Sequence, residues 1–176
     1  VDIVFTTDHG ELQGDFGLLF KGPYHTDSLM RLPLIWRPAP NAAVTPAVVT
    51  APVGLVDLAP TFCGIAGLST PEWMQGSALP VDDPDATARG IDHQLTAWDS
   101  ELFGVGMYLR TITRDGWVCT AYLPGAVHDG TEGELYSLTD DPLQQVNRWD
   151  DPSVRALRDD LVSSLWDEQP PEHDPR

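Results

Sequence analysis

The stretch Val1–Arg37, VDIVFTTDHGELQGDFGLLFKGPYHTDSLMRLPLIWR, decides the fold class. Its first five residues are mostly apolar and β-branched, which predicts a central strand of a sheet that is covered on both faces. Asp8 and His9 follow at the carboxyl end of this strand, and that edge is where open α/β sheets bind ligands. We therefore expect an α/β core with a polar site at the edge of its sheet.

The Asp8-His9 pair has three interpretations that the residues alone leave open. The two side chains could be ligands of a metal ion, a catalytic acid–base pair, or loop residues with local hydrogen bonds. Gly10 gives the backbone enough freedom to turn both side chains toward one ion. Mixed oxygen and nitrogen donors do not distinguish zinc, manganese and calcium, and two ligands are too few for a complete site.

Lys21 is a second candidate, because it follows the apolar residues Leu18, Leu19 and Phe20 and precedes a glycine. A cation in these surroundings is suited to binding a tetrahedral oxyanion as a point charge. The alternative is that its methylene chain covers Leu19 or Phe20 while the ammonium group stays in water.

Three motifs in this stretch occur together, in this order: TDHGE at Thr7–Glu11, GDFGLLFKG at Gly14–Gly22, and RLPLI at Arg31–Ile35. Their order and spacing resemble the second half of the sulfatase signature, within the alkaline phosphatase superfamily. In that family an Asp-His or Asp-Asn pair binds the active-site divalent metal, usually calcium in sulfatases, and the lysine contacts the sulfate of the substrate. One departure is Phe16, since many relatives have histidine at that position.

The resemblance implies roles for specific side chains of this sequence. Asp8 and His9 would bind a divalent metal, with calcium expected and manganese or zinc as alternatives. Lys21 would be a catalytic residue that also binds the substrate. His25, four residues further on, is a weaker candidate for substrate binding.

The resemblance continues along most of the chain and is weakest over residues 82–106. The matching segments are Val56–Thr61, Ala66–Leu68, Gln75–Leu79 and Glu134–Pro142 followed by Asn147.

The nucleophile motif of the family is missing from this sequence. Sulfatases use the Cys or Ser of C-x-P-x-R or S-x-P-x-R, which is converted to formylglycine, whereas related phosphonate and phosphodiester hydrolases can use an unmodified Thr or Cys. Cys63 is followed by GIAG and Cys119 by TAYL, so neither fits. We therefore expect the carboxy-terminal portion of a sulfuric ester hydrolase, inactive alone, with the formylglycine in an upstream segment.

Composition limits the partners of this chain. The 176 residues include 27 Asp and Glu against 10 Lys and Arg, which gives a formal charge of −17. Such acidity disfavours nucleic acid and an anionic membrane surface as partners. No apolar stretch approaches the roughly 20 residues of a membrane span. A sulfate monoester would need local positive potential, which the metal and Lys21 would supply.

Two modules are expected, with a boundary near residue 85 in a segment rich in Pro, Gly and Asp. Residues 1–85 would form the C-terminal half of a sulfatase-like α/β core, and residues 86–176 a small antiparallel sheet with a C-terminal helix. The expected helices cover residues 26–30 and 53–66 and begin again at 152, and the expected strands cover 1–5, 32–36, 89–98, 108–113, 117–122 and 135–138.

Part of a sheet without its neighbouring strands would expose apolar edges and faces. We therefore expect the isolated chain to self-associate or to need a missing amino-terminal half. Two alternatives to a sulfatase remain: a phosphonate monoester or phosphodiester hydrolase of the same superfamily, and a non-catalytic binding or assembly protein that retains the fold.

Overall fold

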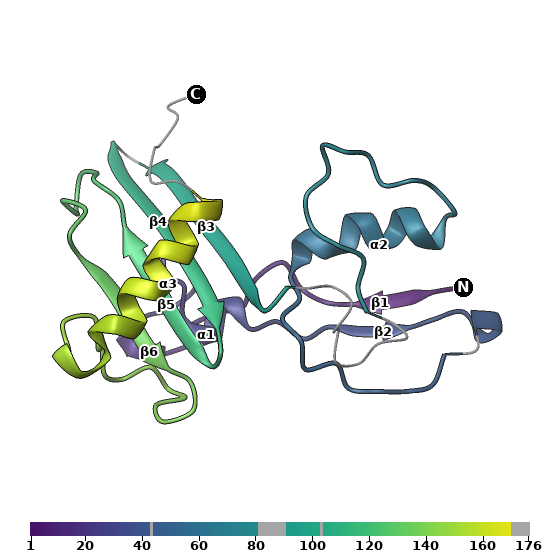
Figure 1. Ribbon diagram of the computed structural model, residues 1–176, viewed down its shortest axis with the longest axis horizontal. Helices are drawn as coiled ribbons and strands as arrows, with labels where there is room; N and C mark the ends of the chain where they lie inside the picture. The colour runs from purple at the N-terminus through teal and green to yellow at the C-terminus, as the bar shows by residue number, and fades with distance from the viewer. Residues whose placement is uncertain (43, 81–90, 103, 170–176) are drawn as a thin grey trace. The chain divides into compact units, whose positions relative to one another are not determined.

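The computed structural model describes residues 1–42, 44–80, 91–102 and 104–169, which fall into two compact units (Figure 1). The first unit comprises Val1–Asp8 and Leu32–Gln94, and the second comprises His9–Arg31 and Leu95–Arg176. The expected boundary near residue 85 lies outside the described residues. Residues 9–31 group with the carboxy-terminal half of the chain, which the two-module prediction did not include.

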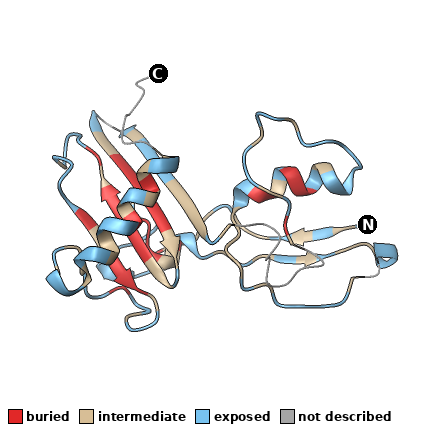
Figure 2. Ribbon diagram, viewed as in Figure 1, coloured by how far each residue is buried: buried red, intermediate tan, exposed pale blue. Residues whose placement is uncertain are grey.

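The first unit contains a two-stranded antiparallel sheet of β1 (Ile3–Phe5) and β2 (Ile35–Arg37). The strand predicted at the start of the chain is confirmed, but its predicted cover on both faces is wrong for this chain. The residues of β1 are exposed or intermediate (Figure 2). Ile3 and Phe5 are 49% and 59% exposed. The apolar pattern of β1 is suited to a buried strand, and among the described residues it pairs with β2 in a sheet of two.

The helix predicted over residues 53–66 is confirmed as a 3-10 turn, Leu55–Asp57, followed by α2 (Leu58–Ile65). Pro60 lies in the first turn of α2, where its missing N–H does not break a helical hydrogen bond. Gly67 ends the helix in the left-handed region, with φ of 69°, and the N–H of Leu68 donates to Cys63 O at 2.9 Å.

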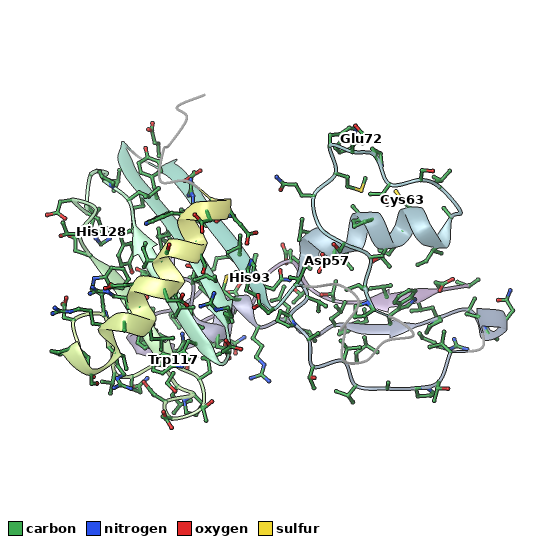
Figure 3. All side chains as sticks on the ribbon, in the orientation of Figure 1. Asp57, Cys63, Glu72, His93, Trp117 and His128 are labelled. Carbon is green, nitrogen blue, oxygen red and sulfur yellow. The ribbon has the colours of Figure 1, made fainter. Side chains whose placement is uncertain are left out.

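Asp57 lies at the start of α2 (Figure 3). Its side chain is 1% exposed. Its carboxylate accepts hydrogen bonds from the backbone N–H groups of Gly54 at 3.0 Å and Ser77 at 2.8 Å. This buried carboxylate therefore ties the loop after α2 back to the beginning of the helix.

The second unit is built on a four-stranded sheet in the order β3-β4-β5-β6. The strands are β3 (His93–Leu102), β4 (Val105–Arg114), β5 (Trp117–Tyr122) and β6 (Gly133–Ser137). The predicted β4-β5 hairpin is confirmed, and its turn residues Asp115 and Gly116 both have positive φ, 52° and 76°. The first two residues of the strand predicted at 89–98 lie outside the described residues, and β3 ends four positions later than predicted.

The helix α3 (Arg155–Glu168) lies across one face of this sheet (Figure 1). A 3-10 turn, Pro152–Val154, precedes it, and the Asp151 side chain accepts from the N–H of Ser153 at 2.8 Å, as the predicted helix start requires. The core under the helix consists of Ile112, Cys119, Ala121, Leu135, Leu161 and Leu165. The mixed α/β architecture, antiparallel sheets and C-terminal helix confirm the predicted fold class.

Residues 9–31, which include the short helix α1 (Asp27–Met30), contact the opposite face of the sheet. Successive side chains on a strand point to opposite faces, so Thr111 points away from the core that contains Ile112. His25 contacts Thr111 on that opposite face. This segment, which contains His9, Lys21 and His25, therefore contacts the sheet of the second unit.

Among the helices in the described part of the chain, none is both long and apolar enough to cross a membrane.

Candidate active-site segment

The turn after β1 contains the predicted metal ligands. The Thr7 hydroxyl donates to Asp8 Oδ1 at 3.3 Å. His9 Nδ1 lies 2.8 Å from the carbonyl oxygen of Gly10. Because a carbonyl can only accept, Nδ1 carries a proton, and in the neutral imidazole the lone pair is then on Nε2. The geometry therefore presents His9 in the tautomer that binds metals through Nε2.

Gly10 is required at this turn by close packing against α1. Its N–H donates to Leu29 O at 2.8 Å. A Cβ at Gly10 would lie 1.9 Å from the backbone oxygen of Ser28, a distance that no side chain can occupy. The glycine thus allows the turn next to His9 to pack directly on the backbone of α1.

Lys21 follows a loop that folds back on itself. The N–H of Leu12 donates to Phe20 O, and the N–H of Gly14 donates to Leu18 O, both at 2.8 Å. Lys21 Nζ lies 3.9 Å from Glu11 Oε1, and the lysine side chain is 57% exposed. An ion pair this exposed contributes at most about 1 kcal/mol, so it does not hold the ammonium group in one place.

The same loop has two aromatic residues in the left-handed region. Phe16 and Phe20 have φ of 57° and 64°, and both side chains are exposed. A non-glycine residue in this conformation costs on the order of 1–3 kcal/mol of free energy, and such residues are concentrated at functional sites. Leu19 and Phe20 are 69% and 74% exposed, so the methylene chain of Lys21 does not cover them.

His25 lies inside the second unit and is 4% exposed. Its Nδ1 is 2.7 Å from the hydroxyl oxygen of Thr111, which is itself 2.7 Å from the hydroxyl oxygen of Thr120. Burial, together with the positive charge of Arg110, lowers the pKa of His25 from 6.5 to about 4. The imidazole is therefore neutral at pH 7. Its contacts in this chain are structural, and substrate binding by His25 stays a prediction.

The predicted site residues are divided between the two units. Asp8 is the last residue of the first segment of unit one, whereas His9 and Lys21 belong to unit two. Within the described ranges, no three or more His, Cys, Asp or Glu side chains form a group that could hold a metal ion. Asp8 and His9 therefore supply two donors, and a metal bound there would need ligands from elsewhere. Metal binding by this pair stays a prediction.

Several buried polar residues around this segment were not predicted from the sequence. Gln144 is 3% exposed with φ of 52°, and its Oε1 accepts from the N–H of Asp27 at 2.6 Å. No local pattern marks Gln144. The Thr111–Thr120 pair could have been found, because a two-residue turn at Asp115-Gly116 sets the register of the hairpin.

No protein-family model matches the chain. The "uncharacterized sulfatase YidJ" of Escherichia coli (strain K12) is 29% identical over 168 residues, which cover 94% of this chain. The chain is homologous to sulfatases. It spans 31% of the length of YidJ, which agrees with the portion of a sulfatase that the motifs predicted.

Solved structures share the fold. A 2-O glycosaminoglycan sulfatase matches with a TM-score of 0.68 and 23% identity, covering 99% of this chain and 39% of that protein. The phosphonate monoester hydrolase of Agrobacterium radiobacter matches with a TM-score of 0.80 and 22% identity, covering 94% and 34%. These likenesses confirm the alkaline-phosphatase-like fold expected for the sulfatase homologue.

Proposed function

We propose that the protein containing this chain is a metal-dependent sulfatase that hydrolyses sulfate monoesters, and that the chain alone is inactive. The observation that supports this most directly is the 29% identity to a sulfatase along 94% of the chain. The Asp8-His9 turn and Lys21 are the chemical groups through which this chain would contribute to the reaction.

Lys21 would bind the sulfate group of the substrate. Its ammonium group is more than half exposed and has a weak contact with Glu11 at 3.9 Å, so it can turn toward an anion without breaking a buried ion pair. In a chain with a formal charge of −17, a cation at this position would provide the local attraction that an anionic substrate needs.

Asp8 and His9 would hold the divalent metal. Asp8 offers a carboxylate oxygen, and the hydrogen bond of His9 Nδ1 to Gly10 O leaves the lone pair on Nε2. This donor set fits a divalent cation, with calcium expected and manganese or zinc as alternatives. When bound, such an ion would act as a Lewis acid at a sulfate oxygen.

The nucleophile would come from another part of the parent protein, as a formylglycine. Cys119 is fully buried, and burial raises the pKa of its thiol to about 12, so it does not provide a thiolate at neutral pH. Cys63 is partly exposed on α2, and its sequence context does not match the family motif. The inactivity proposed for the isolated chain follows from this missing group.

A phosphonate monoester hydrolase is the second candidate, because an enzyme of that class shares the fold with a TM-score of 0.80. The two activities are distinguished by assaying the parent protein with 4-nitrophenyl sulfate and with 4-nitrophenyl phenylphosphonate. A sulfatase should show the higher kcat/KM with the sulfate ester, and the opposite order would favour the phosphonate hydrolase. If neither ester is hydrolysed by metal-loaded protein, the non-catalytic alternative is favoured.

A further inference from the structure

We propose that His25 and Gln144 are positioning residues that fix α1 on the sheet of the second unit, and that α1 in turn fixes the turn containing His9 and Gly10. This proposal rests on the proposed function, because it assigns the two residues a role in arranging a metal ligand. All the contacts involved lie within the second unit.

His25 anchors the chain just before α1. It is buried, and its Nδ1 lies 2.7 Å from the hydroxyl oxygen of Thr111. Thr111 is paired with Thr120 in the register of β4 and β5, and their hydroxyl oxygens are 2.7 Å apart. The three polar groups form a chain inside the sheet, and each member restricts the geometry of the next.

Gln144 anchors the first residue of α1. Its Oε1 accepts from the backbone N–H of Asp27 at 2.6 Å. Its own backbone is in the left-handed region, and its buried Nε2 is without a hydrogen-bond partner in the described structure. The surrounding structure therefore holds Gln144 in a conformation that costs free energy.

The position of α1 determines the position of the candidate metal ligand His9, because α1 is in direct contact with the adjoining Gly10. Gly10 donates its N–H to Leu29 O at 2.8 Å, and the space beside Gly10 is filled by the backbone of Ser28. Leu29 is itself buried, with 4% exposure. A movement of α1 would therefore move Gly10 and, with it, the adjoining His9.

Lys21 is linked to the same anchor through a short turn. Three residues separate it from His25, and the N–H of Tyr24 donates to Gly22 O at 2.8 Å within that interval. Loss of the His25–Thr111 contact would thus loosen the base of the Lys21 loop as well as the His9 turn. Positioning, rather than contact with substrate, is the role that the burial of His25 supports.

The test uses the parent protein with His25→Ala, which removes the contact, and His25→Asn, whose amide can still reach Thr111. Calcium affinity is measured by titration calorimetry on metal-stripped protein, and kcat and KM are measured with 4-nitrophenyl sulfate. We expect His25→Ala to weaken calcium binding and to lower kcat, each by about 10–100-fold, the range seen for outer-shell partners of metal ligands, while His25→Asn recovers most of both. His128→Asn, in the loop after β5 (Figure 3), is the matched control.

Each of the following results would overturn the proposal. Unchanged calcium affinity and kcat in folded His25→Ala would leave only a stability role, and a higher KM with unchanged kcat would indicate direct substrate contact. If His25→Ala does not fold, Thr111→Val removes the same hydrogen bond with little change in volume and must show the same two losses. Hydrogen exchange of peptides covering residues 9–14 must also become faster in the variant. Hydrogen exchange can be measured even if the wild-type parent protein has no sulfatase activity. Absence of that activity would contradict the proposed function, whereas unchanged exchange in the variant would contradict the positioning role.

Discussion

Phe5 lies directly opposite Ile35 in the antiparallel pair of β1 and β2, and both side chains are exposed, by 59% and 63%. Paired residues of neighbouring strands point to the same face of a sheet. These two strands therefore present an apolar face to solvent, on a two-stranded sheet that is too small to be stable by itself.

We expect the isolated chain to self-associate through this face, and Phe5→Glu to reduce the association because it places a charge in the apolar patch. Size-exclusion chromatography with light scattering measures the change. Val127→Glu is the control, since Val127 is 56% exposed but belongs to the second unit. A wild-type chain that remains a monomer at high concentration would contradict the prediction.

The buried imidazole of His25 should make stability depend on pH. Its pKa is lowered from 6.5 to about 4 by burial and by Arg110. The unfolded chain takes up this proton near pH 6.5 and the folded chain only near pH 4, so the free energy of unfolding should fall as the pH drops across that window. Between pH 6.5 and pH 4, the free energy of unfolding should fall by on the order of 3 kcal/mol.

Urea denaturation of the chain at pH 7 and pH 4.5, followed by tryptophan fluorescence, measures this dependence. The change in the free energy of unfolding of His25→Asn between the two pH values is subtracted from that of the wild type. The difference excludes the contribution of other titrating groups. If the free energy of unfolding changes equally with pH in the wild type and in His25→Asn, His25 does not titrate with a lowered pKa.

The sequence allowed the local elements of this fold to be predicted. The hairpin follows from Asp115-Gly116, whose residues adopt positive φ, and the start of the 3-10 turn that precedes α3 follows from Asp151-Pro152. The packing of residues 9–31 on the sheet could not be predicted, because the His25–Thr111 contact joins positions 86 residues apart. The apolar pattern of β1 indicates what the strand is suited to pack against, but not whether a partner lies within the same chain.

Asn147 should stabilise the second unit through three backbone contacts. Its Oδ1 accepts from the N–H groups of Leu135 and Trp149, at 3.0 and 2.9 Å, and its Nδ2 donates to Gly133 O at 3.0 Å. We expect Asn147→Ala to lower the free energy of unfolding by about 1–3 kcal/mol, because partly buried backbone groups lose their partners. Gln145→Ala, two positions away, should change it by less than about 0.5 kcal/mol in the same urea experiment.

Metal removal should inactivate the parent protein, and calcium should restore its activity. Asp8→Asn and His9→Ala should each weaken calcium binding by more than the roughly 10–100-fold effect of an outer-shell residue, because each removes a ligand. Asp15→Asn is the control, since Asp15 is an exposed carboxylate in the neighbouring loop. Full activity in the presence of a strong chelator, or wild-type calcium affinity in both ligand variants, would exclude this pair as the metal site.

Substitution of Lys21 should strongly affect catalysis and should have little effect on the stability of the fold. Its ion pair with Glu11 is long and exposed, so Lys21→Met should leave the melting temperature of the parent protein almost unchanged. If its ammonium group instead binds the sulfate, the same substitution should lower kcat/KM for 4-nitrophenyl sulfate by about 10²–10³-fold, the effect of removing one group that stabilises a developing anion.

Lys21→Arg keeps the charge and should recover part of the loss. Arg155→Met removes an exposed cation from the start of α3 and separates this local effect from a change in net charge. Equal kcat/KM for Lys21→Met and Arg155→Met would show that Lys21 contributes only general attraction, and the oxyanion-binding role would then have to be abandoned.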